Sequence, residues 1–232
     1  MEPQNGERFR ELQLAYLGKL MAGLSHDFKN HLAIIRESSG LIEDLLSLEE
    51  SAQSPYSERF KKILPVITER ISQAAEMCRF FSGFAHRMDH PRSSFSVPEV
   101  LQEELSLLLR FARQKQVELR SSYEKDLTPI YNDPSLLQFA FFCIIWPALE
   151  SFSKDGRISI TVKKLQQDGS IAIVVKLEGS RVKAAEVSPW HELLPEILHK
   201  LEADLSQTVS EEGAEEIVMI IFSLGNSALG NI

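Results

Sequence analysis

The stretch LGKLMAGLSHDFKNHLAII, Leu17–Ile35, decides the fold of the N-terminal part of the chain. Its large apolar residues recur at steps of three and four, which is the spacing of one face of an α-helix. The residues on this face are Leu17, Leu20, Met21, Leu24, Phe28, Leu32 and Ile35. The sequence therefore predicts a long helix with a single apolar stripe.

His26 lies on the opposite side of this predicted helix. At about 100° per residue, it is about 200° away from Leu24 and so faces outward. Lys29 and Asn30 flank it, and three small residues keep the surrounding surface bare of bulk: Ala22, Gly23 and Ala33. A bare surface of this kind favours close approach by another protein.

The residues around His26 suit nucleophilic chemistry. A neutral imidazole attacks phosphorus through one nitrogen while the other nitrogen holds the proton. Asp27 is placed to accept that proton in a hydrogen bond, Lys29 to counter phosphoryl charge, and Asn30 to position a water or a partner's acidic site. On position alone, the alternative is an ordinary solvated surface histidine.

A second long helix is predicted to begin near Ser57, after the polar break Glu49–Pro55. Its apolar residues again alternate steps of three and four: Phe60, Leu64, Ile67, Ile71, Ala74, Cys78, Phe81 and Ala85. Two such helices joined by a short loop form a hairpin, and a second copy covers the apolar surface that one hairpin leaves exposed. Residues 1–90 are thus predicted to form a dimeric four-helix bundle.

The remainder of the chain, residues 95–232, is predicted to be a separate α+β domain after a hinge at Asp89–Ser94. The predicted helices are Pro98–Val117, Pro134–Phe152 and Trp190–Leu205. The predicted strands are Glu118–Ser122, Pro129–Asn132, a hairpin of Arg157–Lys164 and Ile171–Leu177 that turns at Gln166–Gly169, and Glu216–Leu224. Trp190 is either a core residue or a surface anchor.

Composition excludes several classes of protein. The net charge of −8 argues against a nucleic-acid partner, since phosphate binding needs a basic surface. The N-terminus has no apolar signal segment, and apolar runs such as Phe139–Pro147 are too short for a membrane span. We expect a cytoplasmic protein with no membrane contact.

Cys78 and Cys143 lie in apolar helical runs and are expected to be buried thiols.

The stretch Leu17–Ile35 closely resembles the H-box of histidine kinases, in which a histidine is followed by an acidic residue and, three residues further on, by an asparagine. The resemblance implies that His26 is the phospho-acceptor, Asp27 its helper carboxylate and Asn30 a residue of phosphatase chemistry. It also implies that the second domain has the α/β sandwich of the kinase ATPase domain. His31 departs from the pattern, because many kinases have proline there, and it is expected to lie inside the bundle.

The motifs that bind ATP in that family are degenerate here. Asp133–Gln138 resembles the start of the N-box, but its two asparagine positions are occupied by Cys143 and Pro147. The following Asp-x-Gly-x-Gly motif is reduced to Leu177, Glu178 and Gly179, and Val182–Pro189 contains no glycine for a phosphate-binding lid. We therefore expect the domain to have kept its fold without binding ATP, and the chain to need no cofactor and no metal of its own.

A phospho-acceptor without a kinase resembles the dimeric histidine phosphotransferases of bacterial phosphorelays (ChpT-like proteins). The resemblance implies that response-regulator receiver domains, which supply the Mg²⁺, exchange a phosphoryl group with His26. Ala22, Gly23, Lys29 and Ala33 are then the candidate docking residues. The alternatives are a response-regulator phosphatase that depends on Asn30, a dimeric scaffold or antikinase without chemistry, and a kinase with a diverged lid.

Overall fold

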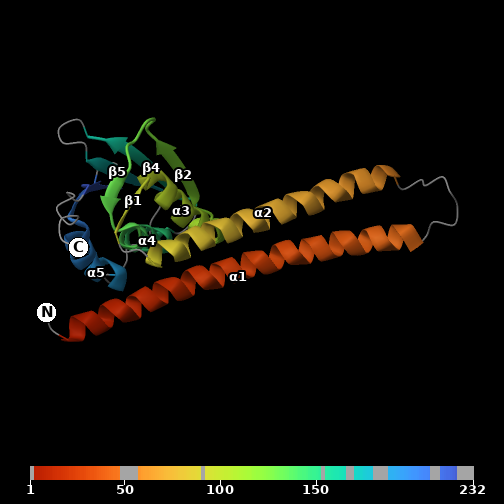
Figure 1. The fold of residues 1–232 in the computed structure, drawn as a ribbon, viewed down its shortest axis with the longest axis horizontal. Coiled ribbons are helices and arrows are strands. Elements are labelled where there is room, and N and C mark those ends of the chain that lie inside the picture. Colours follow the sequence, from red (N-terminus) through yellow and green to blue (C-terminus); the bar gives the residue numbers. More distant parts are fainter. Residues whose placement is uncertain are drawn as a thin grey trace, which may run out of the picture.

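Two long antiparallel helices dominate the chain (Figure 1). The computed structural model describes residues 3–47, 57–89, 92–152, 155–165, 170–179, 188–209 and 215–223. Helix α1 spans Pro3–Ser47 and helix α2 spans Ser57–Asp89, and they lie side by side over the length of α2. We call this pair of helices the stem. The predicted helical hairpin is confirmed.

The second part of the chain is an α/β sandwich. It contains helices α3 (Val97–Gln114), α4 (Pro134–Ser151) and α5 (Pro189–Leu201). Its main sheet has the strand order β2-β4-β5-β7-β6, formed by Glu118–Tyr123, Arg157–Lys164, Ile171–Glu178, Glu215–Ile221 and Ala203–Val209. Strands β2 and β4 are parallel, whereas the other neighbours are antiparallel. The expected α+β class is therefore confirmed.

Helix α4 is the core of this sandwich. Asp133 caps its first turn by accepting hydrogen bonds from the backbone N–H groups of Ser135 and Leu136, each at 3.0 Å. The helix is long and apolar enough to cross a membrane by length and composition, but 72% of it is buried inside the protein. Its hydropathy is that of a core helix enclosed by α3, α5 and the sheet.

Two short elements differ from the sequence prediction. The helix expected at Trp190–Leu205 ends at Leu201, where Glu202 adopts a left-handed conformation with φ 49°, and strand β6 begins at Ala203. The end of the expected hinge, Ser93 and Ser94, lies in strand β1 (Ser93–Phe95), which pairs with β3 (Ile130–Asn132). Both segments are short and partly polar, so periodicity carries little signal there. The predicted turn Gln166–Gly169 and the residue Leu224 lie outside the described residues.

The stem packs directly against the sandwich through α3 and α4 (Figure 1). Tyr16 of α1 is buried among aromatic rings, with its ring centroid 4.6 Å from that of Phe142 and 5.8 Å from that of Phe84. Trp190 is also a core residue and meets Phe142 edge to face. The first half of α1 is thereby anchored to the sandwich, and this anchor fixes where α3 meets the stem.

Candidate functional site

His26 stands on the outer surface of α1, with 53% of its side chain exposed. Its Nδ1 atom lies 3.2 Å from Oδ1 of Asp27 and 3.1 Å from Nδ2 of Asn30. Among the described residues, both hydrogen-bonding contacts of the ring are made by Nδ1 and none by Nε2. When Asp27 accepts the proton of Nδ1–H, Nε2 of this exposed ring keeps its lone pair, which is the arrangement a nucleophile requires.

In the observed geometry, the side-chain amide of Asn30 opposes the tautomer that carries its proton on Nδ1. If its Nδ2–H donates to Nδ1, the imidazole proton must sit on Nε2, and that nitrogen loses its nucleophilic lone pair. A half-turn of the carboxamide replaces Nδ2 by Oδ1, which accepts from Nδ1–H instead. Asp27 and Asn30 therefore compete for one ring nitrogen, and the outcome sets the tautomer of His26.

A charged side chain from the sandwich also reaches this site. Nε of Arg110, on α3, lies 3.3 Å from Oδ1 of Asp27, the same oxygen that lies near His26 Nδ1. The side chains of Arg110 and Asp27 are 25% and 27% exposed, so their ion pair is partly shielded from water. Sequence analysis missed Arg110, because no motif links a residue on α3 to Asp27.

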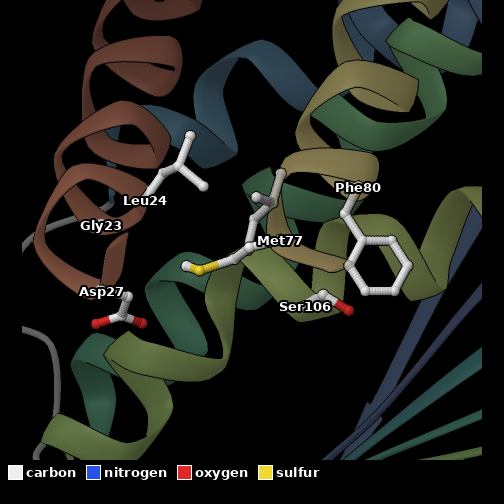
Figure 2. Close-up of a pocket in the computed structure, with 7 residues that line it drawn as sticks. Gly23, Leu24, Asp27, Met77, Phe80 and Ser106 are labelled. Carbon is white, nitrogen blue, oxygen red and sulfur yellow. The ribbon is translucent and has the colours of Figure 1, made fainter. Parts of the chain in front are cut away.

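A small cavity lies beside the carboxylate of Asp27. Figure 2 shows Gly23, Leu24 and Asp27 of α1 facing Met77 and Phe80 of α2 and Ser106 of α3 across it. Its volume is about 20 Å³, which is room for about one water molecule. In the described part of the chain, no group of three or more His, Cys, Asp and Glu side chains is arranged to hold a metal ion.

The four predicted docking residues do not form one open surface. Ala22 and Lys29 are exposed and Ala33 is half-buried, but Gly23 is buried. A Cβ atom at Gly23 would lie 2.8 Å from Cε2 of Phe111 on α3. The expectation for Gly23 is therefore wrong. The glycine leaves room for the ring of Phe111 from the same chain, a contact that helical periodicity alone does not reveal.

Gly23 provides a direct test of this close packing. The ring of Phe111 is held edge to face against Trp146, with centroids 5.0 Å apart, so it cannot move freely. We expect Gly23→Ala to destabilise the protein by about 1–2 kcal/mol, because overpacking outweighs the gain of roughly 1 kcal/mol in helix propensity. At Gly18 an added Cβ meets nothing within 4 Å. Gly18→Ala should therefore stabilise the protein in the same urea unfolding experiment, and equal effects of the two substitutions would contradict the argument.

Two further expectations concern single residues. Cys78 is exposed in the single chain, so its own hairpin does not bury the thiol as expected, whereas Cys143 is fully buried as expected and burial raises the pKa of its thiol. Cys78 belongs to the part of the α2 apolar repeat that faces away from α1.

His31 is half-buried, and its Nδ1 atom is enclosed without a hydrogen-bond partner among the described residues.

The positions that correspond to the nucleotide motifs carry apolar side chains. Cys143 is fully buried, Pro147 has no carboxamide, and Leu177 is 3% exposed. Gly179, with φ 127°, lies so close to Gly156 that an added Cβ would be 3.0 Å from its Cα. The ring of Phe152 closes the same corner, since it lies against Gly156 and leaves no room there for a Cβ. Most of the expected lid, residues 182–187, lies outside the described residues.

Comparisons with known proteins point to one group. No protein-family model matches the chain. It is 27% identical over 174 residues to sporulation kinase E of Bacillus subtilis, a match that covers 75% of this chain and 22% of that kinase. It is 26% identical over 148 residues to the signal transduction histidine-protein kinase AtoS of Escherichia coli, covering 64% and 23% of the two chains. The chain thus spans less than a quarter of the length of these two relatives.

Solved structures share the fold at low sequence identity. The catalytic domain of histidine kinase ThkA superposes with a TM-score of 0.50 at 13% identity, covering 57% of this chain and 97% of that domain. Full-length ShkA in complex with AMPPNP gives a TM-score of 0.50 at 10% identity and covers 90% of this chain and 47% of its own. The chain is therefore homologous to the histidine kinases of two-component signalling systems, and its α/β sandwich has the fold of their catalytic domain.

Proposed function

We propose that the chain is a histidine phosphotransferase that carries a phosphoryl group between receiver aspartates through His26, without binding ATP. The observation that carries the proposal is the exposed imidazole whose Nδ1 faces Asp27, which leaves Nε2 as the nitrogen for attack. In the forward step, Nε2 forms a bond to phosphorus as the bond between phosphorus and the receiver's aspartyl oxygen breaks. The reverse step, with a second receiver, regenerates the free imidazole.

This chain's own residues supply positioning in such a step. Phosphoryl transfer depends chiefly on alignment and on stabilising the charge of the transferred group. Asp27 holds the Nδ1 proton and balances the positive charge on the phosphorylated ring. Lys29 is exposed three residues after His26, and its ammonium group would offset the negative charge of the phosphoryl oxygens. By the resemblance to phosphorelay proteins, the receiver brings the Mg²⁺. Exposed Ala22 and half-buried Ala33 leave space for it to dock.

The buried motif positions support the absence of ATP binding. A magnesium-bound nucleotide needs oxygen ligands and an acceptor for the adenine amino group. Cys143, Pro147 and Leu177 provide neither, and Phe152 packs against Gly156 and Gly179 where the second motif ends. Titration with a fluorescent ATP analogue in the presence of Mg²⁺ should show no saturable binding. Tight binding would favour a kinase with a diverged lid.

A phosphatase acting on a response regulator is the second candidate, and the position of Asn30 favours it. The carboxamide lies one turn beyond His26 and contacts the ring at 3.1 Å, where it can orient a water molecule. The two functions are separated by incubating a phosphorylated receiver with the protein. Transfer places acid-labile label on this chain, whereas a phosphatase releases inorganic phosphate and loses activity in Asn30→Ala.

We also propose that the stem is a homodimer. Large apolar side chains remain exposed along both stem helices: Leu14, Met21, Leu32, Leu41, Leu46, Leu64, Val66, Ile71 and Met88. On α2, Leu64, Ile71 and Cys78 repeat every seven residues, while the alternate positions Ile67 and Ala74 are more buried. A second copy of the hairpin would cover this repeat in a four-helix bundle.

A charge placed in the exposed repeat should break the dimer. Ile71 is 53% exposed in one copy, so Ile71→Glu costs little in the hairpin itself but buries a carboxylate in the proposed interface. We expect this variant to be monomeric by sedimentation equilibrium at concentrations where the wild type is dimeric, a loss of affinity of at least about 100-fold. Ser72→Glu, on the neighbouring exposed position, is the matched control. A monomeric wild type would refute the dimer.

A further inference from the structure

We propose that Arg110 of α3 is a positioning residue that sets the tautomer of His26 through the carboxylate of Asp27. The inference rests on the proposed function and deepens it. It assigns the sandwich a role at the phospho-acceptor that does not involve a nucleotide. The juxtaposition that carries it is one oxygen, Asp27 Oδ1, lying 3.2 Å from His26 Nδ1 and 3.3 Å from Arg110 Nε.

The contact is built into the packing of α3 on the stem. Phe111, the next residue, lies over Gly23, one turn before Asp27 on α1. Its ring packs edge to face on Trp146 of α4, and the Nζ atom of Lys19 lies 4.2 Å from the centroid of that indole. These contacts hold the start of Arg110's side chain beside Asp27. Because α3 is already fixed against the stem, Arg110 reaches the carboxylate with little loss of backbone entropy.

The charge of Arg110 changes what Asp27 does to the imidazole. An unpaired aspartate next to a histidine favours the doubly protonated imidazolium, which has no lone pair and cannot attack phosphorus. A guanidinium on the same oxygen offsets part of that negative charge, and it also fixes the carboxylate where Nδ1–H can donate to it. Both effects favour the neutral ring with its proton on Nδ1 and its lone pair on Nε2.

The charged and polar groups facing this carboxylate come from two elements. Helix α1 contributes His26 itself, with Asn30 against the ring, and α3 contributes Arg110 and, across the small cavity, the hydroxyl of Ser106. Helix α2 contributes Met77 and Phe80 to the adjoining cavity, and neither carries a charge. Removing Arg110 thus leaves Asp27 without its cation. The carboxylate is then no longer held beside the ring, so Nδ1 is left to Asn30, and a hydrogen bond from that carboxamide moves the ring proton to Nε2.

The test reads the ring directly. ¹⁵N NMR of histidine-labelled protein distinguishes Nδ1–H, Nε2–H and imidazolium forms, and His26→Gln identifies the signal. We expect a dominant Nδ1–H form in the wild type, a reduced share of it in Arg110→Ala, and recovery in Arg110→Lys, which keeps the charge. Arg113→Ala removes an exposed arginine further along the same helix and should leave the spectrum unchanged.

The rate of transfer from a phosphorylated receiver provides the second measurement. Arg110→Ala should lower it by roughly tenfold near neutral pH, because fewer molecules then carry the lone pair on Nε2. An unchanged tautomer ratio in Arg110→Ala overturns the inference, whatever happens to the rate. If the wild type shows no transfer at all, the proposed function fails, and the NMR comparison still decides the role of Arg110.

Discussion

His26→Ala should abolish the acid-labile, base-stable label that a radiolabelled phospho-receiver deposits on the wild-type protein. The effect is expected to be a loss of at least about 1000-fold, because the substitution removes the only atom proposed to bond to phosphorus. His26 is 53% exposed, and its polar contacts among the described residues, with Asp27 and Asn30, are to its own helix. The variant should therefore keep the fold, which thermal unfolding followed by circular dichroism will show.

Two control variants make this result specific. His86 is an exposed histidine on α2, and His86→Ala should be labelled like the wild type. Asn30→Ala keeps the nucleophile and should still accept label, whereas it should stop any release of inorganic phosphate that the protein catalyses. Label that persists in His26→Ala would show that another residue accepts phosphorus. The exposed imidazole would then have lost its proposed role.

The long elements and the outward position of His26 were predictable because each depends on a local pattern. Helical periodicity over Leu17–Ile35 is sustained for five turns, and tertiary packing does not override so long a signal. The same periodicity placed Gly23 on the outer face, and the structure buries it under Phe111. Periodicity gives the direction of a side chain from its own helix axis, but it does not say which other element lies there.

Contacts between the stem and the sandwich were not predictable for the same reason. Asp27 and Arg110 are joined only by the way α3 docks on α1, and neither local sequence suggests the pair. A signal did exist for Glu104. It lies on the apolar face of α3 with Leu101, Leu105 and Leu108, where an acidic residue is unexpected unless it is paired or protonated.

Glu104 is fully buried between the stem and the sandwich, where it should make the stability of the protein depend on pH. The hydroxyl of Tyr16 donates to its Oε2 at 2.8 Å, while Oε1 has no partner among the described residues. Burial raises the pKa of the carboxyl from its usual 4.5 to about 8, only partly offset by the hydrogen bond from Tyr16. The folded protein therefore keeps Glu104 protonated at neutral pH.

The direction of the pH effect follows from proton binding. Between about pH 4.5 and pH 8 the unfolded chain has lost the Glu104 proton while the folded protein retains it. The stability contributed by the neutral carboxyl is thus present in full below about pH 4.5 and is lost as the pH rises through about 8. The total loss should be of the order of 3–5 kcal/mol, at 1.36 kcal/mol for each pH unit of the window.

Glu104→Gln should remove this pH dependence, because glutamine has similar shape and no proton to lose. We expect the variant to match the wild type within about 1 kcal/mol near pH 5 and to exceed its stability by several kcal/mol near pH 9, measured by urea unfolding across the range. Glu99→Gln, at an exposed position of the same helix, should leave the pH profile unchanged. Parallel profiles for the wild type and Glu104→Gln would mean that the buried carboxyl is ionised. Tyr16 would then donate to a buried negative charge between the stem and the sandwich. Because that carboxylate would already be ionised in the folded protein, a rise in pH would not weaken the packing of the stem on the sandwich.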